Sequence, residues 1–355
     1  MTKSGPRFAR DFTSAQRRFR AAVAAVGGHI ESHVHPLRGP DGEALATDVA
    51  RFGSQQAKEL LILISGVHGV EHYPGSACMV SWLESGAAAR LPDNVAVLLI
   101  HAINPWGAAH YRRYTEGNVD LARNFVNFDR PLPVHRKYDI IHEAISSADR
   151  NRVAASLSQL FAELGERDAI EALMGGQYAF PDGFSFGGQK AQWSNIQLRD
   201  ILSKHAVDAE AVTVIEYHSG LGPFGYGMPV TMQTGSGLER VRNLFGPDVV
   251  APRAGEGLHS APGHTSDGYA EALPDSCLTS IVLEYGTYLP DVSLPVLLDD
   301  HWVTHHGNPD SAEGRAIKQR NLEMHCPDDP KWEDAVLKRS GEIIGMAFAG
   351  MENCK

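Results

Sequence analysis

The chain has 355 residues, a formal net charge of −11 and 43% hydrophobic residues, which is ordinary for a globular protein with a sizeable core. The acidic balance argues against nucleic acid or an anionic membrane as the main partner, because both attract basic surfaces. No stretch approaches the roughly 20 apolar residues of a membrane span. The four cysteines form no C-x-x-C pair, so we expect reduced thiols and a cytoplasmic protein.

The first half of the chain predicts two buried strands among helices. Residues 8–27 predict an amphipathic helix, whose "QRRFR" resembles a twin-arginine signal but precedes too short an apolar run. The segments "ELLILIS" (59–65) and "NVAVLLIHAIN" (94–104) predict strands buried on both faces, because their apolar runs do not alternate. Residues 75–86 between them predict a helix, and "NPWG" (104–107) predicts a turn.

The second half repeats this alternation. Helical patterns over 137–173 and 190–206 flank a loop rich in glycine and aromatic residues. The segments "EAVTVIEYH" (210–218) and "LTSIVLEYG" (278–286) predict two further strands. The remaining predicted elements are a glycine-rich loop (218–229), a short helix (236–246), a long loop (251–275) and a closing amphipathic helix (331–351).

Strands that alternate with helices predict an α/β fold. We expect a three-layer sandwich with a mixed, largely parallel central sheet and helices on both faces. No repeat or linker divides the chain, so we expect one domain over residues 1–355. Its motif-bearing core should span about 55–300, with peripheral helices in 1–50 and 300–355.

Three of the four predicted strands end in side chains that bind metals or move protons. The first strand runs into His68 and Glu71, the third ends at His218, and the fourth ends at Glu284. The ligand crevice of an open α/β sheet lies at the carboxyl ends of its strands, so these side chains can meet. Two histidines and one glutamate form a ligand set of catalytic zinc, which leaves a position open for water. Glu284 would then be the base that takes the proton of that water.

Three arginines follow the second predicted strand. Arg112, Arg113 and Arg123 lie in the segment "NPWGAAHYRRYTEGNVDLARNF" (104–125). A hydrolase of amide bonds needs a cation to stabilise the developing oxyanion. A hydrolase that recognises a terminal carboxylate also needs a guanidinium group to bind it. The arginines therefore favour such an enzyme, although surface charges on a loop would leave the same pattern.

Four stretches resemble the zinc carboxypeptidases of the carboxypeptidase A superfamily, and more narrowly the bacterial branch long labelled a domain of unknown function. They are "GVHGVEHYPGS" (66–76), "NPWG…RRYTEGNVDLARNF" (104–125), "EYHSGLGP" (216–223) and "VLEYGT" (282–287).

The resemblance implies one zinc ion held by His68, Glu71 and His218. It also implies that Glu284 serves as general base and acid, and that Arg113 polarises the scissile carbonyl group.

The resemblance further implies a substrate-binding set. Arg123 matches the arginine that receives the free carboxylate of the substrate, and Arg112 is the alternative to Arg113. Asn124 and Tyr269 are further candidates for substrate contact. The family usually has asparagine where this chain has Ala122. Loss of that amide removes a hydrogen bond worth about 1.5–3 kcal/mol to a charged partner, which weakens the case for a strict exopeptidase.

Other interpretations stay open at this point. The substrate can be a small peptide or an N-acyl amino acid, the latter cleaved by a deacylase of the aspartoacylase or succinylglutamate desuccinylase kind. A second metal ion is possible, with His259, His264 and Asp267 as candidates for contacts to it or to substrate. A non-enzymatic metal- or peptide-binding module is a further alternative. A serine hydrolase is disfavoured, because no G-x-S-x-G elbow is found. The sequence indicates neither an oligomeric state nor a role for His325.

Overall fold

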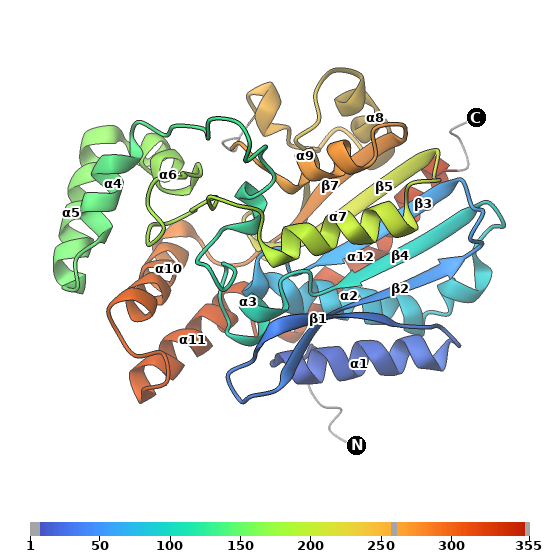
Figure 1. Ribbon diagram of the computed structural model, residues 1–355, viewed down its shortest axis with the longest axis horizontal. Helices are drawn as coiled ribbons and strands as arrows, with labels where there is room; N and C mark the ends of the chain where they lie inside the picture. Colours follow the sequence, from blue (N-terminus) through green and yellow to red (C-terminus); the bar gives the residue numbers. More distant parts are fainter. Residues whose placement is uncertain (1–7, 257–260, 352–355) are drawn as a thin grey trace.

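The computed structural model describes residues 8–256 and 261–351, and its centre is one seven-stranded mixed sheet (Figure 1). The strand order is β1-β2-β4-β3-β5-β7-β6. The four central strands β4, β3, β5 and β7 are parallel, whereas β1, β2 and β6 pair antiparallel at the two edges. The strands are β1 (Glu31–Arg38), β2 (Ala44–Gly53), β3 (Glu59–Ser65), β4 (Val95–His101), β5 (Ala211–Gly220), β6 (Gly227–Val230) and β7 (Cys277–Gly286).

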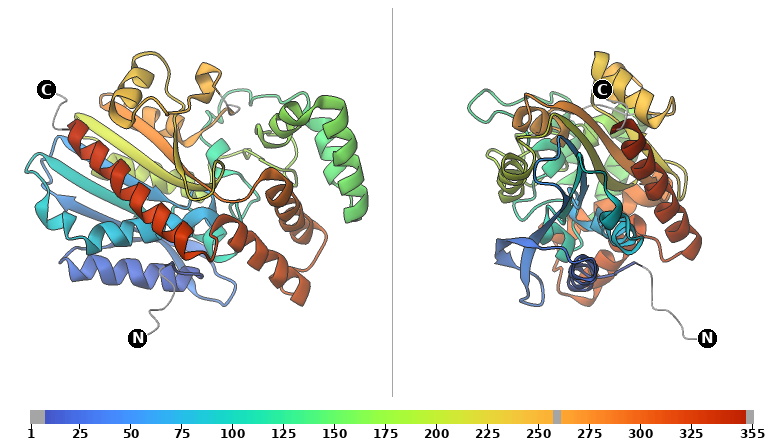
Figure 2. Two further views of the ribbon diagram at one scale, coloured as in Figure 1. Left: turned by 180° about the vertical axis from the view of Figure 1, so that it is seen from behind. Right: turned by 90° about the vertical axis from the view of Figure 1, so that its right-hand side faces the viewer.

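Helices cover both faces of this sheet, which confirms the predicted three-layer fold (Figures 1 and 2). In β3, Leu61 and Leu63 pack into the apolar cluster on one face, and Leu60 packs into the cluster on the other. Burial on both faces explains why this strand is apolar at every position. The first face carries α1 (Phe12–Ala25), α2 (His72–Glu84), α8 (Gly235–Phe245) and α12 (Pro330–Met351), and the second carries α7 (Trp193–His205) and α9 (Thr265–Ala272).

A further group of helices lies beside the sheet, at the left of Figure 1. Four helices of this group share an apolar cluster of their own, to which Ile141, Leu157 and Leu298 contribute. The group consists of α4 (Tyr138–Ile145), α5 (Arg150–Leu164), α6 (Glu166–Met174), α10 (Pro290–His305) and α11 (Ala312–His325), with the short α3 (Pro105–Ala109) between it and the sheet. Among the described residues, no helix combines the length and the apolar character needed to cross a bilayer.

The N-terminal region differs from the expectation of peripheral helices. The helix predicted for residues 8–27 is present as α1, but residues 31–53 form the strands β1 and β2 instead of helices. Only one of the eight residues of β1 is buried, as expected of an edge strand. Its sequence therefore lacks the continuous apolar run that identifies a buried strand. The sheet nevertheless gains an antiparallel edge that covers β4, the second strand predicted.

Candidate metal centre and active site

The turn after β3 holds His68 and Glu71 in place through two glycines. Gly66 has φ +76°, a left-handed conformation that side chains with a Cβ rarely adopt. Gly69 touches the backbone of α3, where a Cβ atom would lie 2.1 Å from the carbonyl carbon of Gly107. The amide of Gly69 also donates to the Arg113 carbonyl at 3.1 Å. The turn is therefore fixed against the segment that supplies the arginines.

The structure brings the three predicted metal ligands together. One possible ligand atom from each of His68, Glu71 and His218 lies within 4.8 Å of the other two, and all three side chains are buried. The Nδ1 atom of His68 is 3.0 Å from Glu71 Oε1, and the Nδ1 atom of His218 is 3.0 Å from Glu71 Oε2. Neither Nδ1 atom makes a hydrogen bond to any described residue. Both nitrogen atoms therefore lie at ion-pair distance from the carboxylate without the geometry of a hydrogen bond.

Two buried carboxylates orient the imidazoles from behind. Asp120 Oδ1 lies 3.1 Å from His68 Nε2, and Glu216 Oε1 lies 2.6 Å from His218 Nε2. An ionised carboxylate can only accept hydrogen bonds, so each Nε2 carries a proton. Each Nδ1 is then the atom that can bind an ion, once it has released any proton of its own. Carboxylate–histidine pairs of this kind are typical of metal centres. Sequence reasoning missed both carboxylates.

The electrostatics also suit a cation. Burial would raise the pKa of Asp120, but the neighbouring Arg113 and the hydrogen bond from His68 hold that pKa well below its usual range. Burial would raise the pKa of Glu216, but its hydrogen bond from His218 lowers that pKa to about 2. For His218, burial would lower the pKa, but Glu216 and Glu71 together raise it well above its ordinary value. The residues present thus fit a divalent ion, with a His₂Glu donor set whose two imidazoles are each bound to a further carboxylate.

Glu284 and Arg113 lie at the same site. Glu284 pairs with His218 across the parallel strands β5 and β7, and its Oε2 atom makes no hydrogen bond among the described residues. Burial, reinforced by the negative charge of Glu71, raises the pKa of Glu284 to about 7. Arg113 donates from Nη1 to Glu71 Oε1 at 2.8 Å, and its Nε is 3.7 Å from Asp120 Oδ2. Both residues therefore lie close enough to Glu71 and His218 to act on a group bound there.

Arg123 is partly buried next to this cluster. It donates from Nη1 to its neighbour's carbonyl, Ala122 O, at 2.8 Å and from Nη2 to Met174 O at 3.2 Å. Its Nε atom is buried and makes no hydrogen bond within the described part of the chain. The Ala122 side chain packs into the apolar cluster on the second face of the sheet, so this position sends no polar group to Arg123.

Two of the predicted substrate contacts, Arg112 and Tyr269, direct their polar atoms to other residues of the chain. Arg112 turns away from the metal ligands, with its Nη2 donating to Asn118 Oδ1 at 2.7 Å and its Nε 3.5 Å from Asp300 Oδ2. Tyr269 is 1% exposed, and its hydroxyl donates to Glu216 Oε2, behind His218. Its hydroxyl therefore supports His218 through Glu216, and in this position it is not free to contact a substrate.

Asn124 is also a structural residue. Its amide nitrogen donates to the carbonyls of Gly187 and Lys190 at 2.8 and 3.0 Å. Its amide oxygen accepts from the Gln192 N–H at 2.9 Å and from Asn195 Nδ2 at 3.1 Å. All hydrogen-bonding capacity of the side chain is used, so Asn124 cannot contact substrate without breaking the loop that it holds.

The second-metal candidates do not assemble within the described residues. The Nδ1 atom of His264 caps α9 by accepting from the Ser266 amide at 3.1 Å. Asp267 forms a two-point ion pair with Arg253, with both contacts at 2.7 Å. His259 lies outside the described residues.

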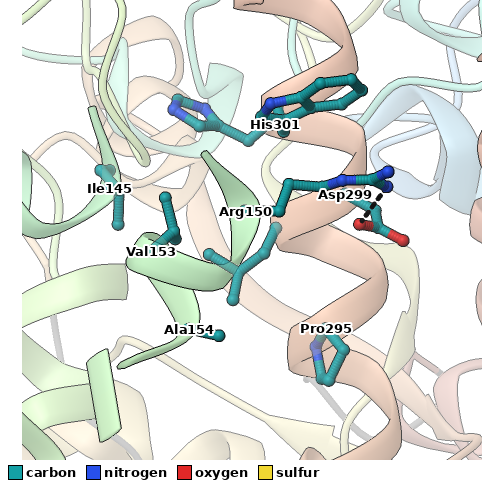
Figure 3. Close-up of a pocket in the computed structure, with 9 residues that line it drawn as sticks. Ile145, Arg150, Val153, Ala154, Pro295, Asp299 and His301 are labelled. Carbon is teal, nitrogen blue, oxygen red and sulfur yellow. Dashed lines mark hydrogen bonds and ion pairs between the residues drawn. The ribbon is translucent and has the colours of Figure 1, made fainter. Parts of the chain in front are cut away.

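A separate hollow lies away from this centre. It measures about 310 Å³ and lies between α5 and α10, where its walls include Val153, Pro295 and Leu298 (Figure 3). None of the predicted site residues lines it.

The family described as "Protein of unknown function (DUF2817)" matches residues 8–339, which confirms the predicted branch. No curated protein matches the chain. A solved carboxypeptidase A from Helicoverpa armigera is 14% identical with a TM-score of 0.46, covering 92% of this chain and 78% of that chain. A succinylglutamate desuccinylase from Chromobacterium violaceum is 13% identical with a TM-score of 0.37, covering 90% and 74%. Because both TM-scores are below 0.5, neither likeness identifies the substrate or the chemistry of this chain.

Proposed function

The chain belongs to the DUF2817 family, and we propose that it is a zinc-dependent hydrolase of an amide bond that acts on peptides as a metallocarboxypeptidase. One observation carries the proposal. The unpartnered Nδ1 atoms of two carboxylate-bound histidines, His68 and His218, face the two oxygens of Glu71 at 3.0 Å. A purely structural polar cluster would satisfy its buried nitrogens with hydrogen bonds.

The chain's own residues can then divide the chemistry. A zinc ion held by His68, Glu71 and His218 would polarise the scissile carbonyl group and lower the pKa of a bound water molecule. Glu284, in its ionised form, takes the proton from the attacking water and delivers it to the leaving amine. Arg113 offers N–H donors to the oxygen that becomes negative in the transition state. A module that only binds metal or peptide needs neither of these last two groups.

Arg123 supports action at a free carboxylate. Its buried Nε–H donor is unused among the described residues, and two backbone carbonyls hold the guanidinium group in one place. A fixed guanidinium group with a free donor is suited to bind the carboxylate of a peptide or of an N-acyl amino acid.

A deacylase of N-acyl amino acids is the second candidate. One observation favours it: the side chain at position 122 is a buried alanine, so the amide that would assist Arg123 in a strict carboxypeptidase is absent. Both candidates use the same ligand set and the same base, and they differ in the side of the amide bond on which the substrate extends.

A matched substrate panel tests the proposal. Peptides with a free C-terminus, the same peptides with an amidated C-terminus, and N-acyl amino acids would be offered to the purified protein with and without a chelator. We expect hydrolysis of carboxylate-bearing substrates, loss of hydrolysis with chelator and recovery with zinc. Hydrolysis that persists after complete metal removal would contradict the proposal, and cleavage of N-acyl amino acids alone would favour the deacylase.

A further inference from the structure

His325, at the C-terminal end of α11, lies beside the metal-ligand cluster. Its side chain is 2% exposed, and its Nε2 atom is 3.7 Å from Glu71 Oε1. No sequence motif marks this residue, and α11 lies outside the part of the chain in which we expected the chemistry.

The orientation of this ring is fixed. Its Nδ1 atom lies 3.0 Å from the carbonyl oxygen of Asn321, one helical turn earlier. Because a carbonyl oxygen can only accept, Nδ1 is the donor, and Nε2 is the atom left to face Glu71. Asn321 in turn donates from Nδ2 to the Tyr111 carbonyl at 2.9 Å, two residues before Arg113. The helix that carries His325 is thus attached to the segment that supplies the arginine of the site.

Glu71 is surrounded by three nitrogen atoms on its Oε1 side. Arg113 Nη1 lies at 2.8 Å, His68 Nδ1 at 3.0 Å and His325 Nε2 at 3.7 Å. The other oxygen accepts from the Ser219 amide at 3.1 Å. The group of three possible ligands does not include His325. A separation of 3.7 Å is longer than a direct hydrogen bond. Because Nε2 of the neutral ring and the carboxylate oxygen are both acceptors, a water molecule that donates to each would link them.

We propose that His325 is a positioning residue of the metal centre, whose Nε2 holds the Glu71 carboxylate, through one water molecule that donates a hydrogen bond to each, in the orientation that binds the ion. The proposal rests on the proposed function, since it concerns the same ion. Groups that hold a metal-binding carboxylate typically account for a 10- to 100-fold change in metal affinity.

A pair of substitutions separates this role from a structural one. The side-chain amide of asparagine reaches the position of Nδ1, so His325→Asn can keep the bond to the Asn321 carbonyl but loses the contact with Glu71. The side-chain amide of glutamine reaches the position of Nε2, so His325→Gln keeps the contact with Glu71. His110→Asn is the matched control, because His110 Nδ1 lies 2.9 Å from the carbonyl of Trp106, also four residues earlier.

The readout is the zinc affinity of the metal-free protein, measured by competition with a chromophoric chelator, with the melting temperature of each metal-free variant recorded alongside. We expect His325→Asn to bind zinc about 10- to 100-fold more weakly. We expect His325→Gln and His110→Asn to bind it within a few-fold of wild type.

Three results would overturn the inference. If wild type binds zinc and His325→Asn binds it equally well, the inference fails while the proposed function stands. If His325→Gln loses as much affinity as His325→Asn, the ring serves only to support the helix. If wild type binds no divalent ion, the proposed function fails and this inference fails with it.

Discussion

Replacement of Glu216 tests how the protein prepares His218 for metal binding. Glu216 is 1% exposed and accepts three hydrogen bonds: Oε1 from His218 Nε2 at 2.6 Å, and Oε2 from Thr265 Oγ1 at 2.6 Å and from the Tyr269 hydroxyl. Glu216→Ala leaves the Nε2–H of His218 buried without an acceptor and frees the ring to turn. The substitution therefore removes both the charge and the orientation of one ligand.

The structure sets the expected magnitude. A hydrogen bond that involves a charged group contributes about 1.5–3 kcal/mol. At about 1.4 kcal/mol for each tenfold change, this corresponds to a loss of roughly 10- to 150-fold in zinc affinity. Glu216→Gln can still present a carbonyl oxygen to His218 without the charge, so its loss should be smaller. Tyr269→Phe removes one hydroxyl from Oε2 and should change the affinity less than tenfold.

The assay is chelator competition on metal-free protein, with circular dichroism and melting temperature to confirm that each variant is folded. The expected order of zinc affinity is wild type, Tyr269→Phe, Glu216→Gln and then Glu216→Ala. A folded Glu216→Ala variant that binds zinc as tightly as wild type would refute this role of Glu216, and so would a Tyr269→Phe variant that loses as much affinity as Glu216→Ala.

Three further changes give distinct outcomes. Glu284→Gln should keep its zinc but lose about 10²–10⁴-fold in kcat. In the wild type, the pKa of Glu284 is raised to about 7, and the base acts only when ionised, so kcat/KM should fall as the pH drops below a midpoint at or below that value. Normal turnover in this variant would exclude Glu284 as the base. Arg123→Ala should reduce kcat/KM for carboxylate-bearing substrates far more than for blocked ones, and equal losses would refute its assigned role. Gly69→Ala places a Cβ 2.1 Å from the Gly107 carbonyl carbon, so calorimetry should show about 1–3 kcal/mol less stability, whereas an unchanged melting temperature would contradict the close contact.

The buried strands and their terminal side chains could be predicted because both follow from burial of the strand on its two faces. A strand covered on both faces must be apolar throughout, so the polar residues at its end stand out, as His68 does after β3 and His218 does in β5. Glu216 left a signal that we did not use. It precedes His218 by two residues in a strand, and such residues share a face of the sheet.

The rest depended on tertiary contacts that a sequence does not display. The choice between Arg112 and Arg113 rests on which direction each side chain takes from one short loop, and only the structure separates them. Asp120 and His325 reach the centre from a loop and from a distant helix, with no periodic pattern around them. The helix α10 was not predicted; it begins at Pro290, a position at which the first helical turn tolerates proline, and it contains a second proline, Pro295.

The metal content of the protein purified without added metal, determined by mass spectrometry of the elements, tests whether His68, Glu71 and His218 hold an ion. We expect about one zinc ion per chain in the wild type and almost none in folded His68→Ala and His218→Ala variants. A folded wild-type protein that contains no divalent metal and binds none on titration would contradict the proposed metal centre. Retention of stoichiometric zinc in either histidine variant would show that the ion is held elsewhere.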